Sequence, residues 1–595
     1  MTMKAHRQEK LQHVQSGRTI KLVALNAKFI HSCLGLFYVR NELSRHYPVA
    51  EVEILQLTIN DNMYESLLRI TEDQPFAVFF SAAIWNSDKV EQLVRDVRSC
   101  LPDCRIVVGG PQAAVLRESL ADSLCSMVIG EIEGVEPAFY SDLESGGLKP
   151  KYHGSFLQLP EKALGYPFRE GDFEVHLKNR HIYYETSRGC PYACTYCLSA
   201  AERGLFHKEL AQVKRELLDI LKHKPKVVRF VDRTFNDIPD RAYAIWQFLI
   251  DQDCDTLFHF EIAPDRFTEE MFELLQNVGH ERFQFEIGIQ STNDVTLAAI
   301  RRRIDKQAVH PIIKRLAALK TIHLHVDLIL GLPHETPESF ARSFAEVFAM
   351  GAHYIQMGLL KILPDTPICH GADEYGYVHS SHPPYSIFAN NWLSHGQVTE
   401  LYWFCECVEK FYNNRYFVSL WSYLRQRQED IFGFFGELLK EGQQSGFLHR
   451  ALTQETLSSI IYQVCSDRPD RELIIELLRY DWLRCGFRRL PQLLEFAEDQ
   501  EDMIATRDLL FRGLPDNVDG VFIHANRNQF FKRSVFMKIS AEAASFLVLA
   551  QDGRQGLRIA FLQEREKTLY GHNAVICFPT NENSLGNRAE NVGCK

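Results

Sequence analysis

Three cysteines, Cys190, Cys194 and Cys197, stand within eight residues, separated by three and then two residues. Thiolates at such short spacings bind a metal ion or an iron–sulfur cluster. A tetrahedral zinc site needs four ligands, and a [4Fe–4S] cluster needs four thiolates if every iron is to have one. Three cysteines are one ligand too few for either. A cluster held by three cysteines leaves one iron open to an outside ligand, which favours chemistry over scaffolding. Zinc is the alternative, but it needs a fourth ligand, and the nearest other cysteines are Cys125 and Cys254.

Composition narrows the class of protein. A chain of 595 residues is long enough for about three domains, and 46% hydrophobic with 24% charged residues is typical of a soluble globular protein. The net charge of −11 argues against a general nucleic-acid binder. Most of the fifteen cysteines lie in apolar runs, as buried thiols do in a reducing compartment. With no signal-peptide core in residues 1–20 and no apolar run of about 20 residues, the sequence predicts a cytoplasmic protein without a membrane span.

The elements that must position these cysteines fall into two alternations of strands and helices. The first occupies residues 20–145, after a polar arm at residues 1–19, and it predicts an open parallel sheet with crossover helices. Ligands of such a sheet bind at the carboxyl ends of the strands. The expected strands are Ile20–Phe29, Val52–Thr58, Ala77–Ile84, Arg105–Gly109 and Ser126–Ile129, and two expected helices are Leu34–His46 and Asp88–Leu101.

Residues 146–180 are rich in Gly, Pro and Lys and are interpreted as a linker. The second alternation spans residues 181–375 and gives six β/α units, too few for an eight-unit barrel, so we expect a partial (β/α)6 barrel. The cysteines follow its first strand, where such a barrel carries chemistry. Its expected strands are Ile182–Thr186, Val227–Val231, Phe258–Ile262, Phe283–Ile289, His323–Leu330 and Tyr354–Ile362.

Residues 376–595 lose this alternation and predict a mainly helical C-terminal domain whose role no motif indicates. The fold class is therefore α/β with a helical tail. Expected helices are Trp392–Tyr412, Val418–Lys440 and Glu472–Arg484, and expected strands are Val521–Ile523, Phe536–Ile539 and Leu557–Phe561.

The stretch from Thr186 to Cys197 resembles the radical S-adenosylmethionine (SAM) superfamily, whose signature is three cysteines at this spacing. The resemblance implies a [4Fe–4S] cluster whose open iron chelates SAM. It also implies reductive cleavage of SAM to a 5′-deoxyadenosyl radical that abstracts hydrogen, with electrons from a flavodoxin- or ferredoxin-type donor. Further strand-end segments support it in order along the chain, namely Phe230–Asn236, Phe260–Pro264, Glu286–Ser291, Asp327–Thr336 and Leu360–Pro367.

By the same resemblance, Tyr196 is expected against the adenine and Glu261 on the ribose hydroxyls, with further SAM contacts from Asp232, Gln290 and Ser291. Structural roles are the alternative for each: a core aromatic for Tyr196, and helix caps for Asp232 and Glu261. The run Arg301–Arg303 is expected on a solvated helix face, with one arginine within possible reach of the SAM carboxylate.

The first domain resembles the cobalamin-binding domain that precedes the radical core in one large subclass, through Phe80–Asn86, Val107–Pro111 and Val128–Gly134. The histidine motif that supplies the lower axial ligand is missing, so His31 is expected to be a polar pocket residue rather than a metal ligand. A Rossmann-like domain that has lost its ligand is the alternative. The candidate cobalamin contacts are Ser81, Trp85, Asn86, Gly109, Gly110, Gly130 and Glu131.

Together these resemblances imply a radical SAM enzyme, with cobalamin-dependent methylation of an unactivated carbon as the leading hypothesis. A rearrangement, cyclisation or redox reaction without methyl transfer is the runner-up. A tRNA methylthiotransferase needs a second cluster on N-terminal cysteines, and an iron–sulfur or cobalamin sensor would not need so many cofactor-facing strand ends. The sequence does not identify the substrate. The candidates for a second cluster are Cys33, Cys100, Cys104 and Cys125.

Overall fold

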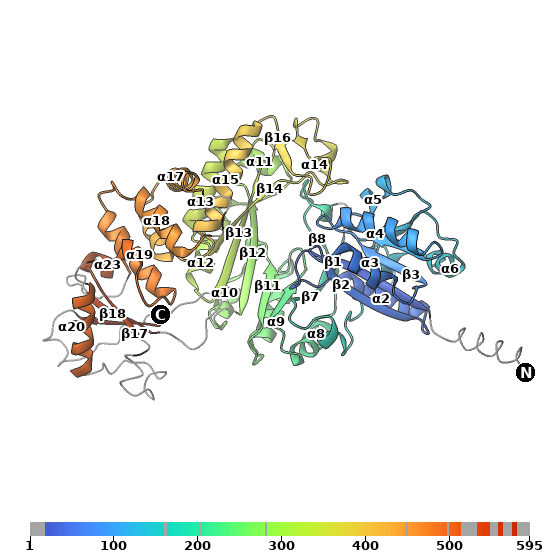
Figure 1. Cartoon of the computed structure of the whole chain (residues 1–595), viewed down its shortest axis with the longest axis horizontal. Helices are drawn as coiled ribbons and strands as arrows, with labels where there is room; N and C mark the ends of the chain where they lie inside the picture. The colour runs from blue at the N-terminus through green and yellow to red at the C-terminus, as the bar shows by residue number, and fades with distance from the viewer. Residues whose placement is uncertain are drawn as a thin grey trace, which may run out of the picture.

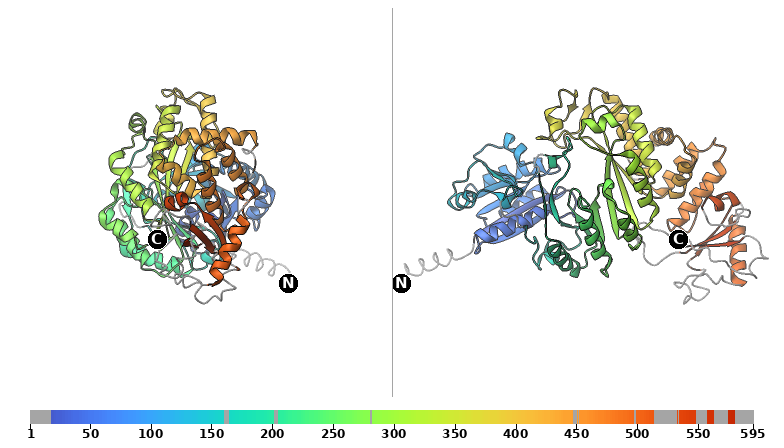
Figure 2. Two further views of the ribbon diagram at one scale, coloured as in Figure 1. Left: turned by 90° about the vertical axis from the view of Figure 1, so that its left-hand side faces the viewer. Right: turned by 180° about the vertical axis from the view of Figure 1, so that it is seen from behind.

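The computed structural model arranges the chain as three bodies in a row (Figures 1 and 2). A first α/β body is followed by a central partial barrel and then by a helical body with a small sheet, drawn from blue through green to red. The expected fold class is therefore confirmed. The structure describes residues 18–159, 164–200, 204–279, 282–446, 450, 452–496, 499–512, 532, 534–547, 557–562 and 574–579.

The first body is a six-stranded parallel sheet in the order β2-β1-β3-β4-β5-β6. Alternation along β1 explains why helices cover both faces, because Leu22 and Ala24 face one apolar cluster while Val23 and Leu25 face the other. The strands are β1 Thr19–Asn26, β2 Glu51–Thr58, β3 Ala77–Ser81, β4 Arg105–Gly109, β5 Ser126–Gly130 and β6 Lys151–Gly154. The helices are α2 Leu34–His46, α3 Met63–Thr71, α4 Ser87–Cys100, α5 Ala113–Ser119 and α6 Ala138–Ser145.

Residues 146–180 are more than a linker. They contain β6, which pairs with β5 and extends the first sheet, and the short helix α7 Asp172–Val175. The four-residue strand is too short for its pattern to stand out beside Gly and Pro, so only pairing with β5 defines it.

The central body is a parallel sheet in the order β7-β10-β11-β12-β13-β14, the expected six-stranded partial barrel. Aromatic residues on the outer face, such as Phe260 and Phe285, pack around the fully buried Trp246 of α9. The strands are β7 Ile182–Tyr184, β10 Val227–Phe230, β11 Leu257–Glu261, β12 Phe283–Gln290, β13 Ile322–Leu330 and β14 Tyr354–Leu359. Its helices are α8 Leu210–Lys222, α9 Pro239–Ile250, α10 Glu269–Leu275, α11 Asp294–Ala299, α12 Lys306–Ala318 and α13 Pro337–Met350.

The third body begins against the barrel edge. The side-chain amide of Asn413 accepts a hydrogen bond from the backbone N–H of Ile355 and donates one to its carbonyl, each at 2.9 Å. These bonds satisfy backbone groups of β14, the edge strand, and so close that edge to further pairing. Helices α15 His395–Phe411, α16 Val418–Gln426, α17 Ile431–Gln444, α18 Gln454–Val464 and α19 Arg471–Arg484 follow.

The tail also holds α20 Asp499–Arg512, α23 Ala541–Phe546 and a three-stranded antiparallel sheet of β17 Ser534–Ile539, β18 Leu557–Leu562 and β19 Ala574–Pro579. The expected helix at 418–440 is instead two helices, because the chain turns at Gln428 (φ +53°) and Asp430 caps α17. The expected strand at 521–523 lies outside the described residues. No helix in the described part of the chain is both long and apolar enough to cross a membrane.

Several polar contacts join the first body to the segment that leads into the barrel. A buried ion pair links Arg40 of α2 to Asp172 of α7, with both guanidinium nitrogens donating to the carboxylate at 2.5 and 2.6 Å. After β1, Ser32 donates to the carbonyl of His181 at 2.9 Å and Arg180 donates to that of His31 at 2.7 Å. The carboxyl ends of β1 and its neighbours are thereby held against the start of the barrel.

Replacing Asp172 with Ala should leave Arg40 buried without its carboxylate. We expect a loss of about 3–5 kcal/mol in the free energy of unfolding of this region, measured as a lower thermal midpoint. Glu174→Ala is the matched control, because it breaks the exposed pair with Lys178 and should cost less than about 1 kcal/mol. Equal shifts for the two variants would contradict a role for the buried pair.

Candidate functional site

The loop after β7 carries the three cysteines. It starts with the strand β8 Ser187–Cys190, which pairs antiparallel with β9 Gly204–His207. Gly189 has φ +98°, and a Cβ there would collide with the carbonyl oxygen of Gly204. Only glycine allows this close hairpin, which places Cys190 at the end of a rigid strand.

The remaining cysteines are held from two directions. The backbone N–H of Thr195 donates to the carbonyl of Ile300 at 3.1 Å, and the carbonyl of Thr195 accepts from the N–H of Ile368 at 3.0 Å. Cys194 is buried beside Arg302, whose guanidinium donates to its sulfur at 3.6 Å and also to the carbonyl of Gly288. The expectation that the arginine run lies on a solvated face is wrong for Arg302, because the cysteine loop folds over it.

These residues fit a [4Fe–4S] cluster. Burial raises the pKa of Cys190, and the neighbouring thiols of Cys197 and Cys194 raise it further, so the three sulfurs share one electrostatic environment. Within the part of the chain that the structure describes, no three His, Cys, Asp or Glu side chains converge on a single ion. A cluster needs no such convergence, because each cysteine binds a different iron.

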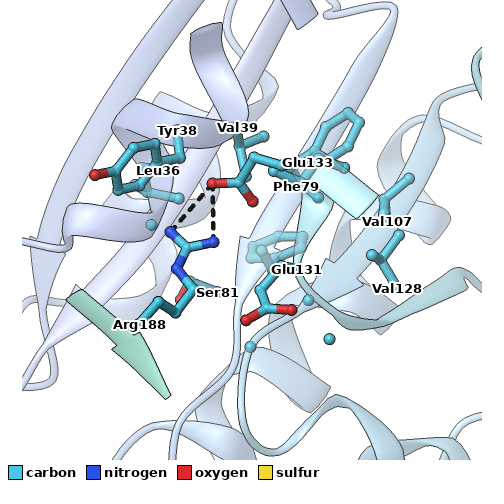
Figure 3. Close-up of a pocket in the computed structure, with 16 residues that line it drawn as sticks. Leu36, Tyr38, Val39, Phe79, Ser81, Val107, Val128, Glu131, Glu133 and Arg188 are labelled. Carbon is cyan, nitrogen blue, oxygen red and sulfur yellow. Dashed lines mark hydrogen bonds and ion pairs between the residues drawn. The ribbon is translucent and has the colours of Figure 1, made fainter. Parts of the chain in front are cut away.

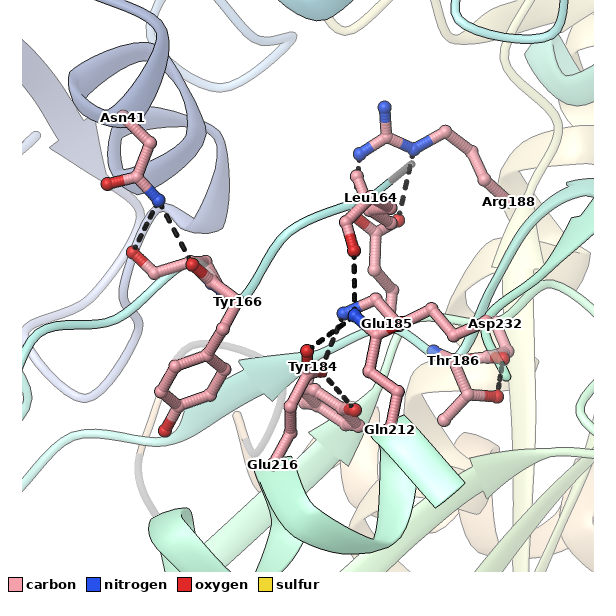
Figure 4. A network of polar contacts seen from close by, with 12 residues as sticks. Asn41, Leu164, Tyr166, Tyr184, Glu185, Thr186, Arg188, Gln212, Glu216 and Asp232 are labelled. Carbon is pink, nitrogen blue, oxygen red and sulfur yellow. Dashed lines mark hydrogen bonds and ion pairs between the residues drawn. The ribbon is translucent and has the colours of Figure 1, made fainter. Parts of the chain in front are cut away.

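Asp232, which follows β10, is turned toward the start of the cysteine loop. Its buried carboxylate accepts hydrogen bonds from the N–H and hydroxyl of Thr186 at 2.9 and 2.6 Å, and from the hydroxyl of Ser187 at 2.7 Å. Figure 4 shows the Thr186–Asp232 contact. The structure thus gives Asp232 a positioning role, tying the root of the cysteine loop to β10. The sequence-based prediction of a SAM contact is untested.

Carboxyl groups gather on the inner face of the barrel. Glu261, Glu286 and Asp327 alternate with residues of the outer core, and Glu261 and Glu286 are direct partners in the sheet register. Burial raises the pKa of Glu261 to about 7, and the nearby carboxylate of Glu286 contributes. Burial, together with Glu286 and Glu261, raises the pKa of Asp327 as well. Burial therefore favours the protonated form of both Glu261 and Asp327.

Glu286 behaves differently because it has basic neighbours. Its carboxylate lies 2.9 Å from Nε2 of His259 and 4.0 Å from Arg229, which itself contacts His259 at 3.1 Å. Its pKa is lowered although burial opposes this, because His259 and Arg229 stabilise the charge. The inner face therefore places one carboxylate whose charged form is stabilised beside two carboxyl groups whose charged form is disfavoured by burial.

The other predicted SAM contacts are spread over two sides of the sheet. Tyr196 packs at the edge of an apolar cluster with Leu297 and Ile300. Gln290 ends β12 at a bulge with φ +71°. Ser291 is buried and its hydroxyl accepts from the N–H of Asn293 at 3.0 Å, on the side of α13. The structure brings Glu261 and Gln290 to adjacent inner strand ends, but not Ser291.

The first sheet has a cavity of about 200 Å³ at the carboxyl ends of β3, β4 and β5 (Figure 3). Five of the predicted cobalamin residues line it, namely Ser81, Gly109, Gly110, Gly130 and Glu131. Its walls are mostly apolar, with Leu36, Val39, Phe79, Val107 and Val128 among them. A flat, partly apolar cofactor group fits such a cavity. One wall residue, Arg188, comes from the cysteine loop.

Three of the candidate cobalamin residues, Gly110, Asn86 and Trp85, have structural roles in the loops around the cavity. Gly110 has φ +97°, and a Cβ there would lie 2.5 Å from the carbonyl oxygen of Ala82, so the chain's own turn requires glycine at this position. Asn86 is buried and donates to the carbonyls of Leu25 and Ser81 at 2.9 and 3.1 Å, so it fixes the loop rather than lining the cavity. Trp85 lies outside the cavity lining, half exposed, with its indole N–H on the carbonyl of Leu25.

His31 has a partner in the barrel. Its Nδ1 lies 2.6 Å from the hydroxyl of Tyr183, in β7, and its ring meets that of His181 edge-on. This contact commits His31 to the junction between the two bodies and is consistent with a role other than metal ligation.

The candidates for a second cluster lie apart. Cys33 is at the carboxyl end of β1, with its thiol 3.5 Å from the hydroxyl of Ser81. Cys104 and Cys125 are buried just before β4 and β5, at the amino ends of these strands, whereas Cys33 lies on the side of the carboxyl ends. Cys100 is exposed at the end of α4. These four cysteines therefore do not form a three-thiol site.

Comparisons with known proteins agree with this arrangement. Residues 20–139 match the B12 binding domain, residues 184–347 the radical SAM superfamily, and residues 373–548 a domain described as a protein of unknown function (DUF4080). A 2-(S-pantetheinyl)-carbapenam-3-carboxylate methyltransferase of Streptantibioticus cattleyicolor is 26% identical over 487 residues, 72% of this chain and 70% of that protein. A tRNA-2-methylthio-N(6)-dimethylallyladenosine synthase of Dehalococcoides mccartyi is 23% identical, over 31% of this chain and 46% of that protein.

Among solved structures, the cobalamin-dependent SAM radical enzyme OxsB, with aqua-cobalamin and SAM bound, superposes with a TM-score of 0.55 at 14% identity, over 85% of this chain and 82% of that chain. This likeness supports the fold.

Fold and site together define an iron–sulfur enzyme with a second cofactor domain. The chain belongs to the radical SAM enzymes that carry an N-terminal B12-binding domain and a C-terminal DUF4080 domain. Their cofactors are a [4Fe–4S] cluster, SAM and cobalamin.

Replacing Cys194 with Ala should abolish cluster binding, because three thiolates are the minimum that anchors the cluster. Anaerobically reconstituted protein should lose its iron and acid-labile sulfide and should no longer cleave SAM. Cys100→Ala, at an exposed cysteine of the first body, is the control and should retain both. Undiminished SAM cleavage by the Cys194 variant would refute the cluster assignment.

The raised pKa of Glu261 predicts a dependence of stability on pH. Its pKa rises from 4.5 to about 7 on folding, so the folded state holds a proton that the unfolded state has released. Between these values, stability falls as pH increases, by at most about 3 kcal/mol. Glu261→Gln should remove this fall, so the variant should gain thermal midpoint relative to the natural protein at about pH 8 but not at about pH 5. Glu273→Gln, at an exposed residue of α10, should show no such difference, and a pH-independent effect of the Glu261 change would contradict the assignment.

Proposed function

We propose that this protein catalyses cobalamin-dependent methylation of an unactivated carbon. The observation that carries the proposal is the shared wall between the two cofactor sites, since Arg188 lines the cavity of the B12-binding domain and lies two residues before Cys190. A methyl group and a hydrogen-abstracting radical must reach the same carbon, so adjoining sites suit methyl transfer.

In this proposal the residues of the two sites bind the cofactors as follows. Cys190, Cys194 and Cys197 hold the cluster, and Glu261 binds the ribose of SAM. The cavity at the ends of β3, β4 and β5 holds the nucleotide tail of cobalamin. When bound, the cluster and SAM supply a radical that removes hydrogen, and cobalamin supplies the methyl group. A flavodoxin- or ferredoxin-type protein delivers the electrons.

The inner face of the barrel then receives the substrate. Arg229 and Glu286 are partly exposed there, at 30% and 26% of their side-chain surface, beside Glu261 and Asp327, whose pKa values are raised by burial. A polar substrate would find both donors and acceptors at this position.

The test is anaerobic reconstitution with iron, sulfide and hydroxocobalamin, followed by incubation with reductant, SAM labelled in its methyl group, and a small-molecule extract of the source cells. Methyl transfer uses SAM both as methyl donor and as radical source. We therefore expect S-adenosylhomocysteine and 5′-deoxyadenosine in equal amounts, together with a compound that gains the label, detected by mass spectrometry. Cys194→Ala is the control and should yield no labelled compound.

Two outcomes would contradict methyl transfer. One is a reconstituted protein that binds no cobalamin at saturating ligand. The other is 5′-deoxyadenosine without S-adenosylhomocysteine, which would favour a rearrangement, cyclisation or redox reaction.

A further inference from the structure

The guanidinium of Arg188 occupies the place where the cobalamin cavity meets the cysteine loop. It is the one cavity-lining residue, among those the structure describes, that comes from outside the B12-binding domain. Figure 3 shows it among the residues that line the cavity, joined to Glu133. Arg188 is therefore part of both the cavity wall and the cysteine loop.

Two carboxylates share this one cation. Arg188 donates to Glu133 at 3.2 Å and, through two nitrogens, to Glu185 at 2.6 and 3.2 Å. All three side chains are nearly buried, at 13% exposed for Arg188, 11% for Glu133 and 8% for Glu185. The guanidinium also lies over the ring of Phe156 at 4.7 Å. In such surroundings an arginine fork holds a fixed geometry.

Glu133, Arg188 and Glu185 form an ion-pair relay, and its two ends, Glu133 and Glu185, belong to different cofactor sites. Glu133 lies in the short 3-10 helix Ile132–Gly134 that follows β5, and it lines the cavity. Glu185 follows β7 and directly precedes Thr186, which Asp232 holds (Figure 4). Arg188 itself lies in β8, whose last residue is the cluster ligand Cys190. A shift of the guanidinium would therefore move a cavity wall and a cluster-ligand strand together.

A plain domain-joining role does not require this placement. Arg40 of α2 and Asp172 of α7 already form a buried ion pair between the first body and the segment that leads into the barrel, and neither residue lines the cavity or lies in the cysteine loop. Arg180 adds hydrogen bonds to the loop after β1. Arg188 differs from both, because it contacts the cavity and the cluster strand at once.

We propose that Arg188 is a positioning residue that couples occupancy of the cobalamin cavity to the geometry of the cysteine loop. Cobalamin in the cavity holds Glu133 and Arg188 in place and so fixes β8 and Cys190. A bound cluster fixes Cys190 and so presents Arg188 to the cavity. Each cofactor removes part of the ordering cost of the other, and the coupling is reciprocal. The inference requires that both cofactors bind, but not that the reaction is methyl transfer.

The test measures cobalamin affinity in the presence and absence of the cluster. Hydroxocobalamin is titrated into full-length reconstituted protein and into protein from which iron has been removed by chelation, and the dissociation constants are compared. We expect the cluster to tighten cobalamin binding by roughly fivefold or more, the lower end of typical coupling between sites. Cobinamide, which lacks the nucleotide tail, should show a much smaller ratio because it leaves the cavity unfilled.

Two variants separate coupling from folding. Glu133→Ala cuts the cavity side of the relay and leaves the pair between Arg188 and Glu185 intact, so both cofactors should still bind but the affinity ratio should fall toward one. The triple variant Arg188→Met, Glu133→Gln, Glu185→Gln removes all three charges without leaving a buried ion alone, and it should give the same result with an unchanged thermal midpoint. Arg180→Ala is the matched control, an interdomain arginine outside the relay, and should keep the wild-type ratio.

Three results would overturn the proposal: equal affinities with and without the cluster in the natural protein, a wild-type ratio in the triple variant, or loss of the ratio in Arg180→Ala. Because the readout is binding, failure of the methyl-transfer assay leaves this test intact. Conversely, a negative result here does not bear on which reaction the enzyme catalyses.

Discussion

The structure of the site depends on one buried carboxylate. Asp232 receives three hydrogen bonds from Thr186 and Ser187 and thereby ties the root of the cysteine loop to the neighbouring strand β10. A buried carboxylate is costly unless its acceptor positions are filled, so this arrangement holds only with the loop in place. The positions of β8, Cys190 and Arg188 all follow from that attachment.

Parallel sheets explain why two cofactor sites can adjoin. In each sheet the loops that carry ligands leave from the carboxyl ends of the strands. His31, Ser32 and Arg180 hold the loop after β1 against the amino end of β7, and Arg188, from the loop that follows β7, reaches the cavity of the first sheet. On the inner face of the barrel, the pKa values of neighbouring carboxyl groups are shifted in opposite directions. His259 and Arg229 lower the pKa of Glu286, whereas burial raises the pKa values of Glu261 and Asp327. Such divergence among nearby carboxyls is characteristic of functional sites.

Much of the fold was predictable, because in most helices and strands the pattern of apolar residues in the sequence matches the faces that are buried in the structure. The helix Leu34–His46 and the strand Arg105–Gly109 have the predicted bounds, and the six parallel strands of the barrel appear in the predicted order. Prediction failed where a partner distant in sequence decides the outcome. β6 exists only by pairing with β5, and Arg302 is partly buried because the loop of Cys194 lies against it.

The sequence by itself placed three thiols within eight residues, and the resemblance of the segment around them implied a [4Fe–4S] cluster. It also predicted the class of both sheets through their periodicity. Only the tertiary structure decided the hydrogen-bond partners of the candidate polar residues. Asp232, Ser291 and Asn86 turned out to bond the protein's own backbone and side chains, whereas Arg188 and Glu133, which carry no motif, meet at the cavity. Asp232 and Arg188 bond residues 45 to 55 positions away in the sequence, and Ser291 and Asn86 also contact Ser343 and Leu25, 52 and 61 positions away. Such partners follow from packing and not from spacing, which is why local pattern could not assign them.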